Sequence, residues 1–329
     1  MSERTPGFNA SDTGDRLEAT FRDGAWSELR WSRAESLALS PMALGLHYGQ
    51  SIFEGFKALR QEDGEVAVFR PSDHLARFGR SAARMCMPAP PEEALLQGVR
   101  ELVRQRANLV PDAPGFLYLR PLMFSDEPGL APVPAAEFHL LLAALPVDPL
   151  FRREGVRLTT VPDHARAAPG GTGACKCAGN YAAAMAGTRR AQELGLDEVL
   201  WLDATERRWV EETGSMNVMY VRDGRLCTPP LSGTILPGIT RDTLLRLAGD
   251  LGIEAEESPL AIDEDWGRIS EVFSSGTAAG TTHIQRVEHR GEALFHRSAP
   301  GPVATAVGAA YEDLLRGRRE DPAGWRMVV

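Results

Sequence analysis

The sequence has few cysteines, no long apolar run and no surplus of basic residues. Its four cysteines are too few and too scattered for a disulfide scaffold, so a reducing cytoplasm is the expected location. The longest apolar stretch, residues 138–147, contains a histidine and a proline and falls well short of the ~20 residues that span a bilayer. Lys and Arg number 36 against 45 Asp and Glu, and this net charge of −9 argues against a nucleic-acid binder. We therefore expect neither a membrane nor a nucleic acid as partner.

Glycine and proline, in contrast, are abundant: the chain has 32 and 23 of them. The many turns that this implies make the loops the first place to look for chemistry. A length of 329 residues suggests two domains or one large one. The composition changes at residues 148–158, which are charged and rich in turn formers. We predict a small N-terminal α/β domain over residues 1–147, a linker over 148–158 and a large C-terminal domain over 159–329.

Hydrophobic periodicity predicts a mixed α/β fold in both halves. Apolar runs predict strands over residues 64–69, 116–121, 137–145, 198–202 and 216–222. Apolar residues at helical spacing predict helices over 73–85, 92–105, 181–194, 241–251 and 302–316. In the helix 241–251, the predicted apolar stripe consists of Leu244, Leu245, Ala248 and Leu251. The dipeptide Asp223-Gly224 predicts a hairpin turn, and the Ser/Gly/Thr-rich residues 274–282 predict another turn.

Lys176 lies between glycine turns, just ahead of an alanine-rich predicted helix. Its segment is not a nucleotide phosphate loop, because that pattern needs Gly-Lys-Ser/Thr and this chain has Cys-Lys-Cys. Two cysteines in C-x-C spacing are weak support for a metal, and no metal site is expected. A plain loop is one remaining interpretation. The other is a Schiff-base lysine, held on a tight turn and partly desolvated so that its amine is nucleophilic.

Two further loops have the composition of anion sites. Pro237-Gly238 bends the chain ahead of the helix 241–251, so that the N–H groups of Ile239 and Thr240 lie at the helix N-terminus. The Thr240 hydroxyl is then available as cap and as ligand. The turn over residues 274–281 offers more N–H donors to a phosphate or a carboxylate. An ordinary helix start and a plain loop are the alternatives.

Charged residues at three places also need an explanation. Glu211 and Glu212 enter a predicted strand, where such a pair is normally solvated. A carboxylate that faced a pyridine nitrogen would keep that nitrogen protonated. Arg77, on an amphipathic helix, faces solvent by default. Arg120 interrupts an apolar strand and needs a partner if it is buried.

Taken in order, these segments resemble those of the branched-chain amino-acid aminotransferases, pyridoxal-phosphate enzymes of fold type IV. The resemblance runs from about Leu37 to Trp325 and rests on a series of segments, 47–58 (HYGQSIFEGFKA), 69–85, 117–121 (LYLRP), 170–181, 212–217 (ETGSMN), 236–241 (LPGITR) and 275–278 (SGTA). It implies two α/β domains with pyridoxal 5′-phosphate in the cleft between them. It also implies transfer of amino groups between branched-chain, or similar hydrophobic, L-amino acids and 2-oxoglutarate.

The resemblance implies a role for each cofactor-binding residue. Lys176 would be the catalytic residue, which forms the Schiff base and moves the substrate proton. Glu212 would pair with the pyridine nitrogen, and Tyr181 would hydrogen-bond the phenolate oxygen of the ring. The phosphate would be held by Arg77, Ile239, Thr240, Ser275 and Thr277. The remaining cofactor contacts would come from Ser215, Met216, Asn217, Leu236 and Gly238.

The resemblance also implies which residues contact the substrate. Those that orient its carboxylates would be Tyr118, Arg120, Thr277 and Ala278. An apolar side-chain pocket would be lined by Phe53, Met216 and Tyr48, the last from the other subunit of a homodimer or larger homo-oligomer. An arginine beside an apolar wall accepts both the γ-carboxylate of glutamate and an aliphatic side chain.

A few positions depart from the family pattern. Leu150 stands where an aromatic residue is frequent, and Thr282-His283 replaces the usual Pro-Val. These departures leave the substrate open, including an unusual hydrophobic or aromatic 2-oxo acid. Two alternatives remain. One is another fold-type-IV enzyme, a D-amino-acid aminotransferase or an aminodeoxychorismate lyase. The other is a non-catalytic anion- or nucleotide-binding protein.

Overall fold

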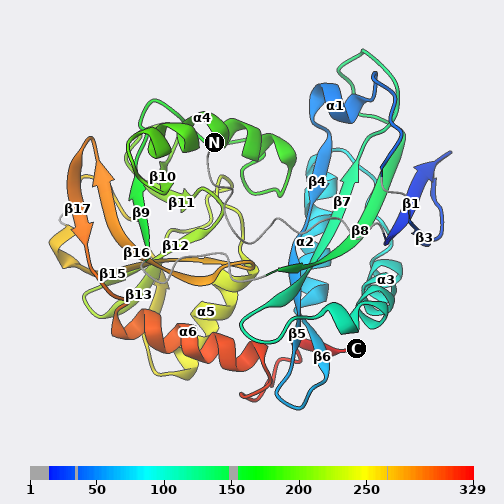
Figure 1. Ribbon diagram of the computed structural model, residues 1–329. Coiled ribbons are helices and arrows are strands. Elements are labelled where there is room, and N and C mark those ends of the chain that lie inside the picture. Colours follow the sequence, from blue (N-terminus) through cyan, green and yellow to red (C-terminus); the bar gives the residue numbers. More distant parts are fainter. Residues whose placement is uncertain (1–14, 34–35, 148–154, 265) are drawn as a thin grey trace. The chain divides into compact units, whose positions relative to one another are not determined.

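The computed structural model describes residues 15–33, 36–147, 155–264 and 266–329. The chain divides into two compact units (Figure 1). The first comprises Met1–Leu150, Cys175–Gly179 and Leu315–Val329, and the second comprises Phe151–Ala174 and Asn180–Leu314. A division into consecutive segments cannot express this arrangement, because the segment around Lys176 and the C-terminus both belong to the first unit. Most of the predicted linker, residues 148–154, lies outside the described residues.

The first unit is an antiparallel sheet with helices against it. The strand order is β18-β6-β5-β7-β8-β1-β2, and β3 pairs with β1 and β4 with β7. The strands are β1 (Arg16–Arg22), β2 (Ala25–Trp26), β3 (Arg30–Ser32), β4 (Ser51–Phe53), β5 (Phe56–Arg60), β6 (Val66–Phe69), β7 (Phe116–Phe124), β8 (Phe138–Val147) and β18 (Arg326–Val328). The helices are α1 (Leu44–Tyr48), α2 (Pro71–Arg84), α3 (Glu92–Gln105) and the short η1 (Ala107–Leu109).

Helices α2 and α3 pack against each other and against this sheet (Figure 1). Leu75 and Phe78 of α2 are buried with Phe56 of β5 and Leu119 of β7 in one apolar core. The predicted helices 73–85 and 92–105 are confirmed, as are the strands at 64–69, 116–121 and 137–145. Strand β5 was not predicted, because four of its residues in succession are buried and the sequence therefore shows no alternation.

The second unit contains a sheet that closes on itself. Strand β11 pairs with both β10 and β12, so the path β11-β10-β9-β16-β15-β12 forms a closed barrel. Its strands are β9 (Val156–Thr159), β10 (Glu198–Leu202), β11 (Val210–Thr213), β12 (Asn217–Arg222), β15 (Ile269–Gly276) and β16 (Gly280–His289). Strands β13 (Arg225–Thr228), β14 (Ala255–Glu257) and β17 (Glu292–His296) extend it. Its helices are α4 (Ala178–Glu193), α5 (Ile239–Asp250), η2 (Trp266–Arg268) and α6 (Pro302–Leu315).

The predicted elements of the second half are confirmed with two corrections. Leu244 and Ala248 of α5 are buried, but Leu251 is 39% exposed, and Leu247 takes its place in the core. Residues 274–282 are mostly strand: β15 and β16 form a hairpin whose turn is confined to 277–279. The hairpin pairing satisfies backbone groups that the composition alone assigned to a loop. Within the described part of the chain, no helix is long and apolar enough to cross a membrane.

Candidate active site

Lys176 is held through its backbone in the first unit. Its carbonyl oxygen accepts a hydrogen bond from the Phe53 N–H at 3.0 Å. Its own N–H donates to Ser81 Oγ of α2 at 3.1 Å, and the next residue, Cys177, forms a bridge with Ile52 of β4. The Lys176 Nζ lies 4.9 Å from the centre of the Phe53 ring. The predicted loop lysine is therefore fixed between a strand and a helix, with its ammonium over an aromatic face.

The same ring carries a second cation, Arg120. The Arg120 Cζ lies 4.7 Å from the Phe53 ring centre and 5.2 Å from that of Tyr118, whose hydroxyl accepts a hydrogen bond from Nη2 at 3.4 Å. Tyr118 and Arg120 share one face of β7 because they are two residues apart. The Arg120 Nε is buried without a hydrogen-bond partner among the described residues. The structure thus brings together Phe53, Tyr118, Arg120 and Lys176, all predicted from the sequence.

Gly55 allows Tyr118 to occupy this position. A Cβ added at Gly55 would lie 1.7 Å from the Tyr118 hydroxyl oxygen, far inside van der Waals contact. Both residues are in the first unit, and Tyr118 is almost fully buried. Only glycine therefore permits the Tyr118 hydroxyl to reach Arg120 from this direction.

Arg77 is buried, not solvent-facing, and belongs to a cluster of three charged or ionisable residues. Its Nε and Nη2 donate to the two carboxylate oxygens of Glu54 at 2.6 and 2.9 Å, and His74 Nδ1 lies 3.0 Å from Glu54 Oε2. Burial alone would raise the pKa of Glu54, but the Arg77 guanidinium and the His74 hydrogen bond hold it well below its usual range. Burial lowers the pKa of His74. Sequence reasoning missed both partners of Arg77.

Glu212 in the second unit is held by two partners. Arg166 Nη2 lies 2.7 Å from Glu212 Oε1, and Asn217 Nδ2 donates to Glu212 Oε2 at 3.2 Å. Arg166 also donates to the Thr234 carbonyl oxygen. The neighbouring Glu211 accepts a hydrogen bond from the Thr234 hydroxyl, and burial raises the pKa of Glu211. Among the described residues Glu212 thus forms a direct ion pair with Arg166, whereas Arg166 only partly opposes the effect of burial on the pKa of Glu211.

Three strands place predicted cofactor residues in one row. Glu212 of β11 pairs in register with Asn217 of β12, and Asn217 pairs with Ser275 of β15. The Ser275 Oγ is buried and has no hydrogen-bond partner among the described residues. Beside it, a Cβ at Gly276 would lie 2.9 Å from the Met216 Cγ. The barrel therefore aligns a carboxylate, an amide and a hydroxyl across its strands.

The start of α5 lies close to the same row. Asn217 Nδ2 also donates to the Leu236 carbonyl oxygen at 2.9 Å, and a Cβ at Gly238 would lie 2.0 Å from Asn217 Oδ1. The expectation that Thr240 caps the helix is wrong. Helix α5 begins at Ile239 with Gly238 as its N-cap, so Thr240 is already inside the first turn, where its hydroxyl lies 3.4 Å from that of Tyr311.

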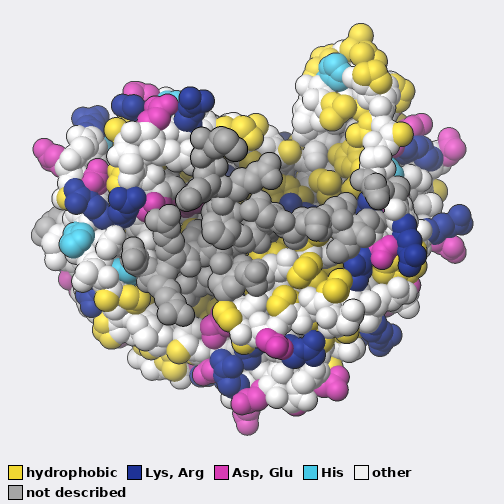
Figure 2. Space-filling model, in the orientation of Figure 1, with side chains coloured by type: hydrophobic (Ala, Val, Ile, Leu, Met, Phe, Trp, Pro, Cys, Tyr) yellow, Lys and Arg dark blue, Asp and Glu magenta, His cyan; other side chains and the backbone are white. Residues whose placement is uncertain are grey.

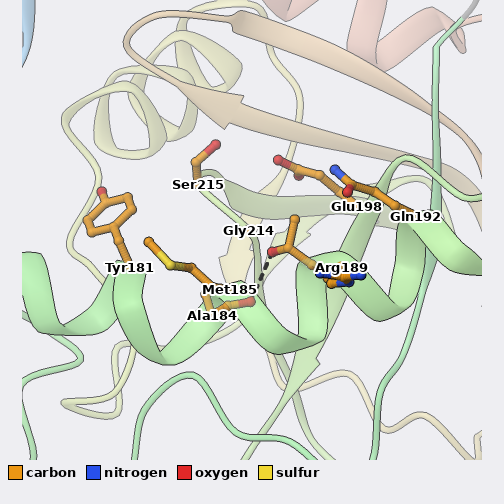
Figure 3. A pocket seen from close by; sticks show the side chains of 9 residues that line it. Tyr181, Ala184, Met185, Arg189, Gln192, Glu198, Gly214 and Ser215 are labelled. Atoms are coloured by element: carbon orange, nitrogen blue, oxygen red, sulfur yellow. Dashed lines mark hydrogen bonds between the residues drawn. The ribbon is translucent and has the colours of Figure 1, made fainter. Parts of the chain in front are cut away.

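Tyr181 and Ser215 line a groove of about 420 Å³ between α4 and the turn that follows β11 (Figure 3). From α4 the groove is lined by Tyr181, Ala184, Met185, Thr188, Arg189 and Gln192, and from the barrel by Glu198, Gly214 and Ser215. Burial raises the pKa of Glu198 to about 7. Glu198 was not singled out in the sequence, where it is one acidic residue before a strand.

The comparisons with known proteins decide the family. The model described as amino-transferase class IV matches residues 51–287 of this chain. Over 97% of its length the chain is 41% identical to the branched-chain-amino-acid aminotransferase of Mycolicibacterium smegmatis, of which it covers 91%. The chain belongs to the class-IV aminotransferase family. The predicted family and enzyme class are confirmed.

Solved structures of the family share the fold of this aminotransferase. The branched-chain amino acid aminotransferase of Escherichia coli matches with a TM-score of 0.79 at 30% identity, over 94% of this chain and 98% of that one. The branched-chain amino acid aminotransferase from T.th., complexed with N-(5′-phosphopyridoxyl)-L-glutamate, matches with a TM-score of 0.77 at 31% identity, over 94% and 97% of the two chains. The predicted fold class, fold type IV, is confirmed.

The residues of the aminotransferase fit pyridoxal 5′-phosphate. The first unit offers an amine on an anchored backbone at Lys176. The second unit offers the Glu212 carboxylate, held by Arg166, for a protonated pyridine nitrogen. It also offers the buried Ser275 hydroxyl and the N-terminus of α5 for a phosphate. Among the described residues, no group of His, Cys, Asp and Glu is arranged to hold a metal ion.

The remaining predicted residues lie in different environments in the aminotransferase. Thr277 and Ala278 lie in the β15–β16 turn. Of the departures from the family pattern, Leu150 lies outside the described residues, while Thr282 is buried and His283 Nε2 is 2.9 Å from the Arg297 carbonyl oxygen. Tyr48 lies on α1, 47% exposed, with its hydroxyl donating to the Leu130 carbonyl oxygen at 2.5 Å.

Proposed function

We propose that this aminotransferase uses pyridoxal 5′-phosphate to transfer amino groups between branched-chain L-amino acids and 2-oxoglutarate. The observation that carries the proposal is the arrangement around Phe53. There the cations of Lys176 and Arg120 lie over one apolar ring, with the Tyr118 hydroxyl bonded to Arg120. An apolar surface next to an arginine that is free to pair with an anion suits both an aliphatic side chain and a carboxylate. The full-length similarity to branched-chain enzymes supports the same substrate class.

Lys176 is proposed as the catalytic residue, and the composition of the chain strengthens this choice. The sequence contains only one other lysine, Lys57. Lys57 is buried in β5, with its Nζ 4.3 Å from the Phe116 ring centre. When bound, the cofactor supplies an electron sink for charge that develops at the substrate Cα. The Lys176 amine would take the proton from the substrate Cα as a general base and then, as a general acid, deliver it to carbon C4′ of the cofactor.

The other proposed cofactor-binding residues would hold and orient the cofactor. Glu212, fixed by Arg166 and Asn217, keeps a proton on the pyridine nitrogen. Tyr181 donates a hydrogen bond to the phenolate oxygen. Arg77, Ile239, Thr240, Ser275 and Thr277 would hold the phosphate. The contacts along the ring come from Ser215, Met216, Asn217, Leu236 and Gly238. These residues are proposed only to bind and orient the cofactor, whereas Lys176 alone is proposed to exchange a proton with the substrate.

The proposed substrate contacts explain how one pocket accepts two kinds of side chain. Arg120 and Tyr118 bind the γ-carboxylate of glutamate, which supplies the anion that Arg120 lacks among the described residues. Phe53, Met216 and Tyr48 contact an aliphatic side chain. The backbone at Thr277 and Ala278 orients the α-carboxylate with its N–H groups.

The test is an absorbance spectrum of the purified protein with pyridoxal 5′-phosphate, recorded before and after L-leucine, L-isoleucine or L-glutamate is added. We expect a visible band that disappears with each of the three donors and returns with 2-oxoglutarate. Borohydride reduction followed by peptide mapping should place the cofactor on Lys176 and not on Lys57. A protein that stays colourless with the cofactor would contradict the proposal.

We also propose that the aminotransferase is a homo-oligomer. Figure 2 shows apolar side chains gathered over α1 and the loop beside it. The exposed residues of this patch are Met42, Leu46, Tyr48, Leu130 and Val133. Leu46, for example, is 64% exposed. A contiguous exposed apolar patch is typical of a protein–protein interface. A second copy that covers the patch would also bury Tyr48, the residue proposed to reach a neighbouring site.

The oligomer is tested by light scattering of the wild type and of Leu46→Glu. We expect the wild type to have at least twice the mass of the chain and the variant to dissociate at the same concentration. A monomeric wild type would contradict the proposal. For location we propose the cytoplasm, which suits the four free cysteines of the chain, three of them buried.

A further inference from the structure

The turn over residues 213–216 joins the two residues that hold the row across the barrel. It leads from Glu212 of β11 to Asn217 of β12, which face each other in register. The turn is closed by the Thr213 N–H and hydroxyl, which both donate to the Met216 carbonyl oxygen, at 2.9 and 3.2 Å. Any change in this turn therefore moves Glu212 and Asn217 relative to each other.

Glu198, the first residue of β10, lies against this turn (Figure 3). Leu200 pairs with Thr213 across the antiparallel β10–β11 ladder, so Glu198 lies next to the end of β11. Its carboxyl accepts a hydrogen bond from the Gly214 backbone N–H and also bonds the Thr213 hydroxyl, whose single proton is shared with the Met216 carbonyl oxygen. A Cβ at Gly214 would lie 3.1 Å from Glu198 Oε1, so the carboxyl contacts the turn closely. The Glu198 carboxyl therefore packs against the backbone of the turn at Gly214.

The second oxygen of this carboxyl has an unusual environment. Glu198 Oε2 is buried and has no hydrogen-bond partner among the described residues. Burial raises the pKa of Glu198 to about 7, although the hydrogen bonds from Thr213 and Gly214 oppose the shift. A glutamate in water would be fully ionised at neutral pH, whereas this one takes up and releases a proton there.

We propose that Glu198 is a positioning residue of this aminotransferase, whose carboxyl fixes the turn over residues 213–216 and thereby sets Glu212 and Asn217 for the cofactor. The inference rests on the proposed function, because it concerns the residues that are proposed to hold pyridoxal 5′-phosphate. Glu198 is not proposed to contact the reacting atoms. It acts through the backbone N–H of Gly214 and the side chain of Thr213.

The other charged groups near Glu198 have partners of their own. Asp197 raises the pKa of Glu198 further, and is itself paired with Arg157 at 3.0 Å. From α4, Arg189 lines the same groove but is paired with Glu193 at 3.3 Å. Gln192 and Thr188 line it as neutral groups. Within the part of the chain that the structure describes, Glu198 forms no ion pair, so its protonation changes chiefly its hydrogen bonds with the turn.

The first experiment compares the affinity for pyridoxal 5′-phosphate in Glu198→Ala, Glu198→Gln and the wild type, measured by titration at pH 7. Glu198→Ala removes both hydrogen bonds to the turn, and we expect about tenfold weaker binding. Glu198→Gln retains the accepting oxygen and should bind within about twofold of the wild type. The control is Glu193→Gln, which changes the same charge on the exposed side of α4 and should bind normally.

Equal affinity of Glu198→Ala and the wild type would overturn the inference while leaving the proposed function intact. A loss of similar size in Glu193→Gln would overturn it as well, since charge near the groove would then be the cause. A wild type that does not bind the cofactor would contradict the proposed function itself. The pH at which the bound cofactor changes its visible band should shift in Glu198→Ala and not in Glu193→Gln.

The second experiment needs no cofactor. Because the folded-state pKa of Glu198 is raised, its contribution to stability is present below pH 4.5 and is lost as the pH rises to about 7. Glu198→Gln lacks this loss. The melting temperature of Glu198→Gln minus that of the wild type should therefore increase by about 2–4 °C or more between pH 5 and 7.5. A constant difference over this range would overturn the buried environment on which the inference depends.

Discussion

The charged groups around Phe53 and those around Glu212 are stabilised in different ways. In the first unit, Arg120 and Lys176 lie over a ring, at 4.7 and 4.9 Å from its centre. In the second unit, Arg166 and Glu212 form a buried ion pair with an N–O distance of 2.7 Å. A ring face attracts a cation without dictating one direction, whereas a hydrogen-bonded ion pair fixes both partners. The residues proposed to bind the substrate thus lie over the ring, whereas the residue proposed to hold the pyridine nitrogen is fixed in an ion pair.

The largest effect should come from Lys176→Ala. It removes the amine that is proposed to move the substrate proton, so kcat with L-leucine should fall by about 10⁴-fold or more. The matched control is Lys57→Arg, which keeps a cation over the Phe116 ring and should retain most of the activity. Steady-state rates and borohydride trapping would check both. A Lys176→Ala enzyme with wild-type turnover would remove the catalytic role from the group around Phe53.

The contrast between ring and ion pair predicts unequal stability losses for two arginines. Arg166→Met leaves Glu212 buried without its cation and should cost about 3–5 kcal/mol in the free energy of unfolding. Arg120→Met removes no ion pair among the described residues and should cost about 1 kcal/mol. Urea denaturation of the two variants measures both values. Equal losses would mean that the two arginines are held in the same way.

Arg120 should instead reveal itself in substrate choice. If it binds the γ-carboxylate, Arg120→Ala should lower kcat/KM for L-glutamate by about 10–100-fold, the value of a charge-assisted pair, and that for L-leucine by less than about threefold. Arg104→Ala, on the exposed end of α3, serves as the control. Similar losses for both substrates would indicate that Arg120 supports the strand rather than the carboxylate.

Gly55→Ala should disturb the same group by a smaller amount. The added methyl collides with the Tyr118 hydroxyl, so we expect a loss of about 1–3 kcal/mol in stability and a raised KM for glutamate. Adding Tyr118→Phe should restore only part of the stability, because it removes the nearest colliding atom, the hydroxyl oxygen, but leaves the ring carbon Cζ, which lies 2.4 Å from the added Cβ. Gly79→Ala is the control: nothing lies within 4 Å of a Cβ there, and the helix should gain about 0.5–1 kcal/mol.

The smallest expected effect is a pH dependence of stability that comes from the first unit. There His74 lies beside the buried ion pair of Glu54 and Arg77. Burial lowers the pKa of His74 below 6.5, so the unfolded chain takes up a proton before the folded chain does. Stability should therefore fall as the pH drops below 6.5, by at most about 1.4 kcal/mol per pH unit. In His74→Gln this component should be absent. Parallel melting curves of the two proteins between pH 7 and 5 would contradict it.

The sequence predicted residues that lie close in the chain or carry a local signature. Tyr118 and Arg120 share one strand, and Lys176 stands out between glycine turns. The partners of these groups could not be predicted, because they come from distant segments: Arg166 for Glu212 and Glu54 for Arg77 have no local pattern. Thr240 was misplaced as a cap for a different reason. The helix begins at Ile239, and helix boundaries depend on backbone bonds that composition does not reveal.

The barrel of the second unit closes through a single register pair between β11 and β12, formed by Glu212 and Asn217. One pair of residues thus completes the cylinder and also carries the proposed contact with the pyridine ring. Closure of the barrel and the proposed cofactor contact therefore depend on the same two residues, and a substitution that alters one function is expected to alter the other. In a library of variants sorted only for soluble expression, substitutions at Glu212 and Asn217 should therefore be rare, as substitutions at buried core positions are. A design that replaces the cofactor at this site would first have to provide another pairing between β11 and β12.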